Sequence, residues 1–440
     1  MPDFASSSDA AVQTQLERIE ALSPGRDILG LERISALMEA LDNPHQKLPP
    51  VFHVAGTNGK GSTCAFLRAA IEASGKNCHV YSSPHLVRFN ERIRISGKLI
   101  ENAQLADLLK RVLDAAEDIN PSFFEVTTAA ALLEFSQSPA DACIIEVGLG
   151  GRLDATNVIA SPLACGIANL GIDHEAFLLA PEQNTPDDPM TRIAWEKAGI
   201  AKKDIPLVVG KYLPEMNAII ADHAQNIGAS LYVQGRDWGI DDDLIYKDSK
   251  GAIPLPQPAM DGPHQRDNAA LAIAMLRHQN VITISEQAMQ KAMQDAHWPA
   301  RLQRLSDGPL KSIVPNHALW LDGGHNRNAG DALAKHFDAV LSNKTPQIHL
   351  IIGMLSNKDP SSILAPLEHH IKSIAVLPVE GHEHHDASAF TMDAITASSC
   401  NDVRQALRNM ANLSKDDIVL IAGSLYLAGE VLSANQQLPD

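Results

Sequence analysis

The segment between residues 51 and 71 constrains this chain more than any other. A short apolar stretch at 51–55 predicts a buried strand, a glycine-rich loop follows at 56–62, and an apolar helical pattern begins near Cys64. A strand that turns through glycines into a helix N-terminus presents several backbone N–H groups to an anion. The segment therefore predicts an α/β fold with a phosphate-binding loop after its first strand.

The side chains of this loop indicate a nucleotide with a metal ion. Lys60 can reach terminal phosphates, and the hydroxyl of Ser62 or Thr63 can bind Mg²⁺. The loop departs from the common pattern, because Gly61 separates the lysine from the hydroxyl and Val54 stands at the first glycine position. A glycine turn without a ligand would explain the glycines alone, but not the strand, lysine, hydroxyls and helix together.

Length, charge and cysteine content limit the class of protein. A chain of 440 residues is too long for one ordinary core, so we expect two domains. The net charge of −17 argues against a general nucleic-acid binder and against binding to an anionic membrane. The five cysteines are odd in number and lack metal-ligand spacing, which is typical of a reduced, cytoplasmic protein. We expect no signal peptide and no membrane-spanning segment.

Several predicted strands end in polar side chains. The expected strands are 77–81, 141–147 and 163–169, with Ser83, Glu146 and His174 at or beyond their carboxyl ends. In a parallel sheet these ends share one edge, so the three side chains could hold a metal beside nucleotide phosphates. Taken alone, His174 also fits a structural histidine and Glu146 a helix-capping acid. Arg152 and Asp154, which follow a glycine turn, also fit a surface ion pair.

The alternation of predicted elements divides the chain in two. We expect a strand at 91–95, a loop insertion at 178–190, and short strands with turns at 235–262. Residues 264–268 are expected to cap an apolar helix at 269–276. Strands and helices resume after 298 as a smaller α/β domain. The expected division is a first domain at 1–298, a hinge at 299–303 and a second domain at 304–440.

Several motifs together resemble the dihydrofolate synthase/folylpolyglutamate synthase family, a branch of the Mur ligase superfamily. In the first domain they are His-Val-Ala-Gly-Thr-Asn-Gly-Lys-Gly-Ser (53–62), Ser-Ser-Pro-His-Leu (82–86), Glu-Val-Gly-Leu-Gly-Gly-Arg-Leu-Asp-Ala-Thr-Asn (146–157) and Glu-Lys-Ala-Gly-Ile (196–200). In the second they are Arg-Leu-Gln (301–303), Asp-Gly-Gly-His-Asn (322–326), Gly-Met-Leu-Ser-Asn-Lys-Asp (353–359) and Ala-Gly-Ser-Leu-Tyr (422–426). The resemblance covers almost the whole chain. It implies a phosphate-loop ATPase domain with a mostly parallel sheet, followed by a Rossmann-like α/β domain.

The resemblance also implies a role for each matching position. ATP would be bound by Thr57, Asn58, Gly59, Lys60, Gly61, Ser62, Asn268, Arg301 and Asp322. Mg²⁺ would be bound by Ser62, Ser83, Glu146, His174 and Lys197, the last as a carbamate. The pterin-bearing substrate would lie near Ala21, Leu22, Ser23, Pro24, Ser122, Phe123, Phe124, Arg152 and Asp154. Lys60, Lys197, His174 and Arg301 would be catalytic. From spacing alone, Lys197 also fits a solvated helix lysine paired to an acid.

The implied reaction is ATP-dependent amide formation through an acyl phosphate, in folate biosynthesis and one-carbon metabolism. L-Glutamate would be added to dihydropteroate or to the γ-carboxylate of a reduced folate by a monomeric cytoplasmic enzyme that binds neither nucleic acid nor membrane. A peptidoglycan-type Mur ligase is an alternative. It is disfavoured because only about fifty residues precede the loop, too few for the separate N-terminal domain usual in that class. A nucleotide-controlled binding switch and a folate-binding protein without catalysis are further alternatives.

Overall fold

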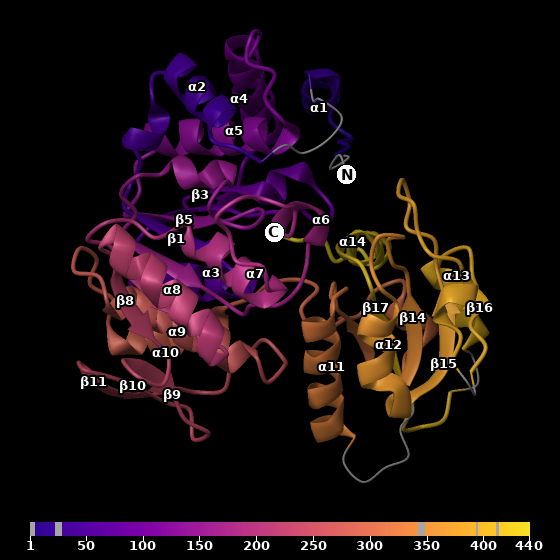
Figure 1. The fold of residues 1–440 in the computed structure, drawn as a ribbon. Helices are drawn as coiled ribbons and strands as arrows, with labels where there is room; N and C mark the ends of the chain where they lie inside the picture. The colour runs from indigo at the N-terminus through magenta and orange to yellow at the C-terminus, as the bar shows by residue number, and fades with distance from the viewer. Residues whose placement is uncertain (1–4, 23–28, 342–347, 393–394, 411–412) are drawn as a thin grey trace. The chain divides into compact units, whose positions relative to one another are not determined.

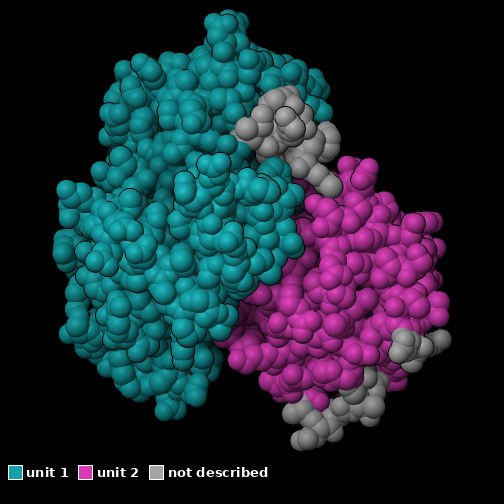
Figure 2. All heavy atoms as spheres, viewed as in Figure 1, with its two compact units in different colours: residues 1–259, 265–297 teal, residues 260–264, 298–440 magenta. Residues whose placement is uncertain are grey.

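The computed structural model describes residues 5–22, 29–341, 348–392, 395–410 and 413–440 (Figure 1). The chain forms two compact units, shown in different colours in Figure 2. Unit 1 comprises residues 1–259 and 265–297, and unit 2 comprises residues 260–264 and 298–440. The short segment 260–264 thus belongs with unit 2 although it lies well before the expected hinge.

Unit 1 is built on an eight-stranded, mostly parallel sheet with the strand order β4-β3-β2-β5-β1-β6-β7-β8. Its strands are β1 (Val51–Ala55), β2 (Cys78–Tyr81), β3 (Ile93–Ile95), β4 (Lys98–Leu99), β5 (Ala142–Glu146), β6 (Ala164–Ile167), β7 (Pro206–Val209) and β8 (Ser230–Val233). Only β3 and β4 run antiparallel to their neighbours. The four central strands are buried along their whole length, as expected for a parallel sheet covered on both faces.

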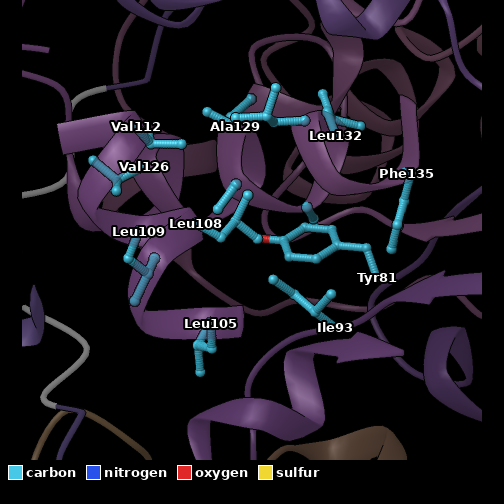
Figure 3. Close-up of a cluster of buried hydrophobic side chains, with 14 of the residues drawn as sticks. Tyr81, Ile93, Leu105, Leu108, Leu109, Val112, Val126, Ala129, Leu132 and Phe135 are labelled. Atoms are coloured by element: carbon cyan, nitrogen blue, oxygen red, sulfur yellow. The ribbon is translucent and has the colours of Figure 1, made fainter. Parts of the chain in front are cut away.

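The helices of unit 1 cover this sheet directly or pack on the helices that do. They are α1 (Ala10–Leu22), α2 (Glu32–Ala40), α3 (Lys60–Ala73), α4 (Asn102–Ala115), α5 (Phe123–Gln137), α6 (Glu175–Leu178), α7 (Pro189–Ala198), α8 (Pro214–Ile227), α9 (Gln265–Arg277) and α10 (Glu286–Asp295). Helices α1, α2, α4 and α5 share one aliphatic core with β2 and β3, and Figure 3 shows Tyr81 at its centre. Elsewhere in unit 1, α3 packs against α9 and α10. Among the described helices, none is long and apolar enough to cross a membrane.

A small antiparallel sheet, β9 (Trp238–Ile240), β10 (Ile245–Asp248) and β11 (Gly251–Pro254), completes unit 1 and packs against α9. Arg277 of α9 forms an ion pair at 2.6 Å with Asp248, whose side chain is fully buried. The sequence predicted short strands and turns in this region, and the structure agrees.

Unit 2 contains a six-stranded sheet with the order β12-β13-β17-β14-β15-β16, in which only β12 is antiparallel to its neighbour. Its strands are β12 (Gln303–Arg304), β13 (Leu319–Leu321), β14 (Ile348–Ile352), β15 (Ile371–Val376), β16 (Ser398–Ser399) and β17 (Ile418–Ala422). Its helices are α11 (Arg327–Val340), α12 (Ser361–Leu367), α13 (Val403–Asn409) and α14 (Leu425–Ala434). The two α/β units confirm the predicted fold class.

Two local predictions were wrong, and each has an identifiable cause. Residues 89–92 form a 3₁₀ turn rather than the start of the strand predicted at 91–95. The Glu91 carboxylate accepts the backbone amides of residues 86, 87 and 88, which curls the chain. Residues 265–268 lie inside α9 instead of capping it. The first turn of a helix and its N-cap both lie beside backbone N–H groups that have no helical partner, so both favour polar residues. The two therefore look alike in sequence.

The predicted loop at 178–190 is shorter in the structure. Pro189 is the first residue of α7, and Asp188 caps this helix by accepting the amide of Thr191. Proline is favoured at this position because its missing N–H would have no helical partner. Residues 179–188 therefore form the irregular part of the insertion, between α6 and α7.

Candidate active site

The four strands that precede the predicted site residues are neighbours in the sheet. The order β2-β5-β1-β6 places the residues that follow them at one edge, with the glycine loop after the third strand. Glu146 is the last residue of β5 and pairs in register with Val54 of β1. The sheet therefore brings the segments that carry Ser83, Glu146 and the glycine loop to one end, as the sequence predicted.

The glycine loop is held in a conformation that requires glycine. Gly59 has φ of 84°, and a Cβ added there would stand 2.4 Å from Oδ1 of Asn268. Gly56 has φ of 154°, and its added Cβ would stand 2.9 Å from the Cβ of Ala168. Asn268, in the first turn of α9, thus lies against the loop, although it is more than two hundred residues away in sequence.

The lysine of the loop bends back over the loop itself. Nζ of Lys60 donates to the carbonyl oxygen of Gly56 at 3.0 Å and to that of Thr57 at 3.4 Å. Ser62 is buried in the first turn of α3, and the neighbouring Thr63 has a buried hydroxyl without a hydrogen-bond partner among the described residues. A lysine held at a glycine loop that leads into a helix N-terminus is the arrangement that binds nucleotide phosphates.

Thr57 anchors the loop to the segment after β6. Its amide donates to the carbonyl of Asn169 at 2.8 Å, and its hydroxyl donates to the carbonyl of Gly171 at 2.7 Å. The amide of Asn58 also donates to Asn169 at 3.2 Å. Sequence reasoning assigned Thr57 to ATP and did not foresee this tertiary contact. The sequence does not indicate which neighbouring segment a polar residue at the end of a strand will contact.

The acidic and basic groups of the loop region lie near one another. Glu146 is only 4% exposed. Burial raises the pKa of the Cys64 thiol well above its usual value; the charge of Glu146 raises it further, whereas that of Lys60 lowers it. The carboxylate and the ammonium therefore both lie close to Cys64 of α3. Ser62, Ser83 and Glu146 offer oxygen atoms, the ligands that Mg²⁺ prefers, so the residues present suit this ion.

Lys197 is buried, which contradicts the alternative of a solvated helix lysine. It is 3% exposed, in the last turn of α7. A Cβ added at Gly151 would stand 2.9 Å from the carbonyl oxygen of Glu196 and 3.1 Å from Cα of Lys197, so the glycine turn after β5 packs directly on this helix. Burial lowers the pKa of Lys197 to about 7, and the nearby charge of Lys60 lowers it as well. A large part of this amine is therefore neutral at neutral pH.

Two arginines and two glutamates form an ion-pair network on α7, the helix that carries Lys197. Arg152 contacts Glu196 at 3.0 Å and Glu182 at 2.6 Å. Arg192 contacts the same two carboxylates at 3.3 and 2.9 Å. Both guanidinium groups also lie over the ring of Trp195, at 4.5 and 5.2 Å from its centroid. Arg152 therefore contacts α7 rather than forming the surface pair with Asp154 that the sequence left open.

Asp154 is buried and bound to its own loop. Its Oδ2 accepts the amide of Leu149 at 2.8 Å, and its Oδ1 accepts the amide and hydroxyl of Thr156 at 3.0 and 2.5 Å. Burial raises the pKa of Asp154, although these hydrogen bonds and the charge of Lys60 act in the opposite direction. The structure thus places Asp154 in the same region as the glycine loop.

The other predicted substrate positions lie at the start of α5 and the end of α1. Ser122 caps α5, and its hydroxyl accepts the amide of Glu125. The ring of Phe124 covers Gly148, where an added Cβ would stand 2.2 Å from Cζ of that ring. Phe123 packs under Arg92 instead. Ala21 is exposed and Leu22 packs on the core at the end of α1, whereas Ser23 and Pro24 lie outside the described residues.

Ser83 and His174 differ in their surroundings. Ser83 follows β2 closely and is half-buried. His174 is exposed, has φ of 53°, and precedes the short helix α6. The structure therefore leaves this histidine at the surface of unit 1, while Glu146 and Lys197 are in the interior.

In unit 2, the predicted nucleotide-binding residues Arg301 and Asp322 lie in adjoining turns. Asp322 follows β13 and accepts the amides of Leu302 at 2.8 Å and Gly324 at 2.7 Å. An added Cβ at Gly323 would stand 3.2 Å from Nη1 of Arg301. Asp322 thus fixes the turn that carries Arg301.

The fold and the loop geometry define an α/β protein with a phosphate-loop unit and a second α/β unit, and comparisons with known proteins identify it as an ATP-dependent ligase of a known family. The family model described as "Dihydrofolate synthetase, C-terminal domain" matches residues 311–434. The chain is 36% identical over 410 residues to the dihydrofolate synthase/folylpolyglutamate synthase of Escherichia coli, covering 92% of this chain and 90% of that protein. The chain belongs to the dihydrofolate synthase/folylpolyglutamate synthase family.

Solved structures agree. E. coli FolC in complex with DHPP and ADP matches with a TM-score of 0.85 and 32% identity, covering 98% of each chain. A bifunctional folylpolyglutamate synthase/dihydrofolate synthase with Mn, AMPPNP and L-glutamate bound matches with a TM-score of 0.83 and 32% identity, over 97% of this chain and 99% of that one. These relatives bear out the dependence on ATP and a divalent metal, and they favour the folate family over a peptidoglycan ligase or a nucleotide switch.

Proposed function

We propose that the protein joins L-glutamate to dihydropteroate, to the γ-carboxylate of a reduced folate, or to both, with cleavage of ATP to ADP and phosphate. The observation that carries this proposal is the convergence of Lys60, Glu146 and the buried Lys197 near one end of the unit 1 sheet. The names and ligands of the relatives support the substrate class.

The chemistry would begin with attack of the substrate carboxylate on the γ-phosphorus of ATP. This attack gives an acyl phosphate and ADP, and the amine of glutamate then displaces phosphate to form the amide. Both reactants of the first step are anions, so the positive charge of Lys60 and the loop amides would stabilise the transferred phosphoryl group. Mg²⁺, when bound through Ser62, Ser83 and Glu146, would neutralise phosphate charge and orient the phosphates.

Lys197 would act as a carbamate. Its neutral amine would attack the carbon of CO₂, forming a C–N bond and releasing a proton, and the product carries a carboxylate-like group. The low pKa of the amine supports this step, because only the neutral form is nucleophilic. A carbamate would supply hard oxygen ligands where the native amine supplies a positive charge.

The remaining predicted positions complete the proposal. Thr57, Asn58, Gly59, Gly61 and Asn268 would contact the phosphates in unit 1, and His174 would complete the metal ligands. Arg301 and Asp322 would contact ATP from unit 2, with residues 299–303 as the hinge. The pterin would lie near the residues at the end of α1, at the start of α5, and at Arg152 and Asp154.

The proposed enzyme is a monomer in a reducing compartment such as the cytoplasm. The five cysteines, all buried and free, support the reducing compartment. Light scattering after size-exclusion chromatography tests the oligomeric state. A mass near 47.4 kDa is expected, and twice that value would contradict it.

Product analysis tests the function directly. The protein is incubated with ATP, Mg²⁺, isotopically labelled glutamate and either dihydropteroate or tetrahydrofolate, and product masses are measured. We expect labelled product with at least one acceptor, together with stoichiometric ADP. ATP hydrolysis that does not respond to glutamate or to either acceptor would contradict the proposal.

A further inference from the structure

Unit 2 contains a cluster of metal-ligating side chains that the ligase chemistry does not use. Asp338 lies in α11, and His369 and His370 lie in the 3₁₀ turn Glu368–His370 that leads into β15. The ligand atoms of the three residues all lie within 4.8 Å of one another. Among the described residues, this is the one group of three or more histidines, cysteines or acids that meets that criterion.

The geometry is close to that of a metal site. Nε2 of His370 is 2.7 Å, and Nε2 of His369 is 3.5 Å, from the same oxygen, Oδ1 of Asp338. Ligand atoms about 2.1 Å from a tetrahedral ion stand roughly 3.4 Å apart. The longer contact already fits this value, and the shorter one has to lengthen by roughly 0.7 Å, which a rotation of the exposed Asp338 side chain can supply.

The donor atoms select a kind of metal. Two imidazole nitrogens and one carboxylate oxygen suit Zn²⁺ and other late first-row ions, whereas Mg²⁺ prefers oxygen ligands alone. The side chains of His369 and Asp338 are 65% and 58% exposed. An ion bound here would therefore have access to solvent and could complete its coordination with water.

The cluster combines one buried ligand with two exposed ones. The His370 side chain is 6% exposed and is held by packing, so one ligand is oriented before an ion arrives. Nδ1 of His370 is buried without a hydrogen-bond partner among the described residues. Without an acceptor at that nitrogen, the site will bind metal less tightly than zinc sites with a supporting acceptor.

We propose that Asp338, His369 and His370 form a binding site for a divalent transition-metal ion such as Zn²⁺, separate from the Mg²⁺ of the ligase reaction. The ion would connect α11 to the turn that enters β15. Because α11 and α12 already pack against each other and the turn follows α12, the ion would strengthen an existing contact. The site is independent of the proposed function, so either can fail alone.

Zinc titration of the full chain tests this site. Isothermal titration calorimetry is done in a non-chelating buffer with excess Mg²⁺, comparing wild type with His369→Ala and Asp338→Asn. His384→Ala is the matched control, because His384 is an exposed histidine of the same unit outside the cluster. We expect both cluster variants to weaken one Zn²⁺-binding event by at least about 10-fold. The control should bind as wild type does.

Cobalt spectroscopy adds evidence on coordination. Co²⁺ in place of Zn²⁺ should give visible absorption bands in the wild type that disappear in His369→Ala. Melting curves without metal check that the variants fold, and both altered side chains are largely exposed. No Zn²⁺ binding to the wild type, or unchanged binding in both cluster variants, would overturn the proposal.

Discussion

Oδ1 of Asn268 occupies the space in which any side chain on Gly59 would begin. A Cβ on Gly59 would stand 2.4 Å from that oxygen, and the backbone there has φ of 84°. The side chain of Asn268 in α9 therefore packs directly on the glycine loop, in the region proposed to bind phosphate.

Gly59→Ala should weaken nucleotide binding and destabilise unit 1. The left-handed backbone alone costs about 1–2 kcal/mol for alanine, and displacement of Asn268 adds to this. Gly75→Ala is the control, since Gly75 has φ of 75° but open space around its added Cβ. Denaturant unfolding and ADP titration should show a larger loss for Gly59→Ala, and equal losses in the two variants would contradict the close fit.

Lys60→Ala should abolish ligation without unfolding the protein. Loss of one phosphate-directed charge in a site sheltered from water costs on the order of 10²–10³-fold in rate. Lys98→Ala, which alters an exposed lysine of the same unit, should behave as wild type. Steady-state turnover at saturating ATP is the measurement, and near-normal turnover in Lys60→Ala would remove this lysine from the mechanism.

Activity should depend on CO₂ through Lys197. With a pKa near 7, roughly half of this amine is neutral at neutral pH, whereas an ordinary lysine is almost fully charged. We expect turnover to fall in CO₂-depleted buffer and to return when bicarbonate is added. Lys197→Ala should be inactive, with partial rescue by acetate, and Lys203→Ala serves as the exposed control. Full activity of the wild type without CO₂ would exclude the carbamate.

Glu196 and Glu182 should contribute unequally to stability, although they contact the same two arginines. The side chains of Glu196 and Arg192 are each 5% exposed, so Glu196→Gln leaves a buried positive charge and should cost about 3 kcal/mol. Glu182 is 44% exposed, so Glu182→Gln should cost less than about 1 kcal/mol and be sensitive to salt. Urea unfolding of the two variants measures the difference, and similar costs would show that burial does not govern this network.

Acid should destabilise the protein through His53. Burial lowers the pKa of His53 to about 3, helped by the charge of Lys202, while Nε2 contacts the hydroxyl of Thr156 at 2.8 Å. Above pH 6.5 the histidine is neutral in both the folded and unfolded states. As the pH falls from 6.5 towards 3, only the unfolded state takes up the proton, so the free energy of unfolding decreases.

The contribution of His53 to this slope grows as the pH falls through 6.5 and approaches about 1.4 kcal/mol per pH unit below about pH 5.5. Urea unfolding between pH 7 and 5 measures this slope in wild type and in His53→Gln, which lacks the titrating group. The slope of the free energy of unfolding against pH should be smaller in the variant, by an amount that corresponds to about one proton at the acid end of this range. An identical slope in both proteins would mean that His53 is not the group responsible.

Much of the fold could be predicted from local sequence pattern. The predictions were wrong where tertiary contacts compete with that pattern. The strand, loop and helix at 51–71 were predictable because apolar periodicity and glycine positions act locally. The 3₁₀ turn at 89–92 was not, because it depends on the Glu91 carboxylate binding three amides. Helix α8 was not predicted either, although Pro214 begins it and Gly228 ends it.

The sequence by itself determined the residue types of the site: a lysine among glycines, and acids and hydroxyls after strands. Only the tertiary structure decided which of them meet. Parallel strand order placed β5 beside β1, and thus Glu146 near the loop, and it left His174 at the surface. Packing of α7 on Gly151 buried Lys197 and lowered its pKa. Burial and charge proximity depend on contacts between distant segments, and no local periodicity encodes them.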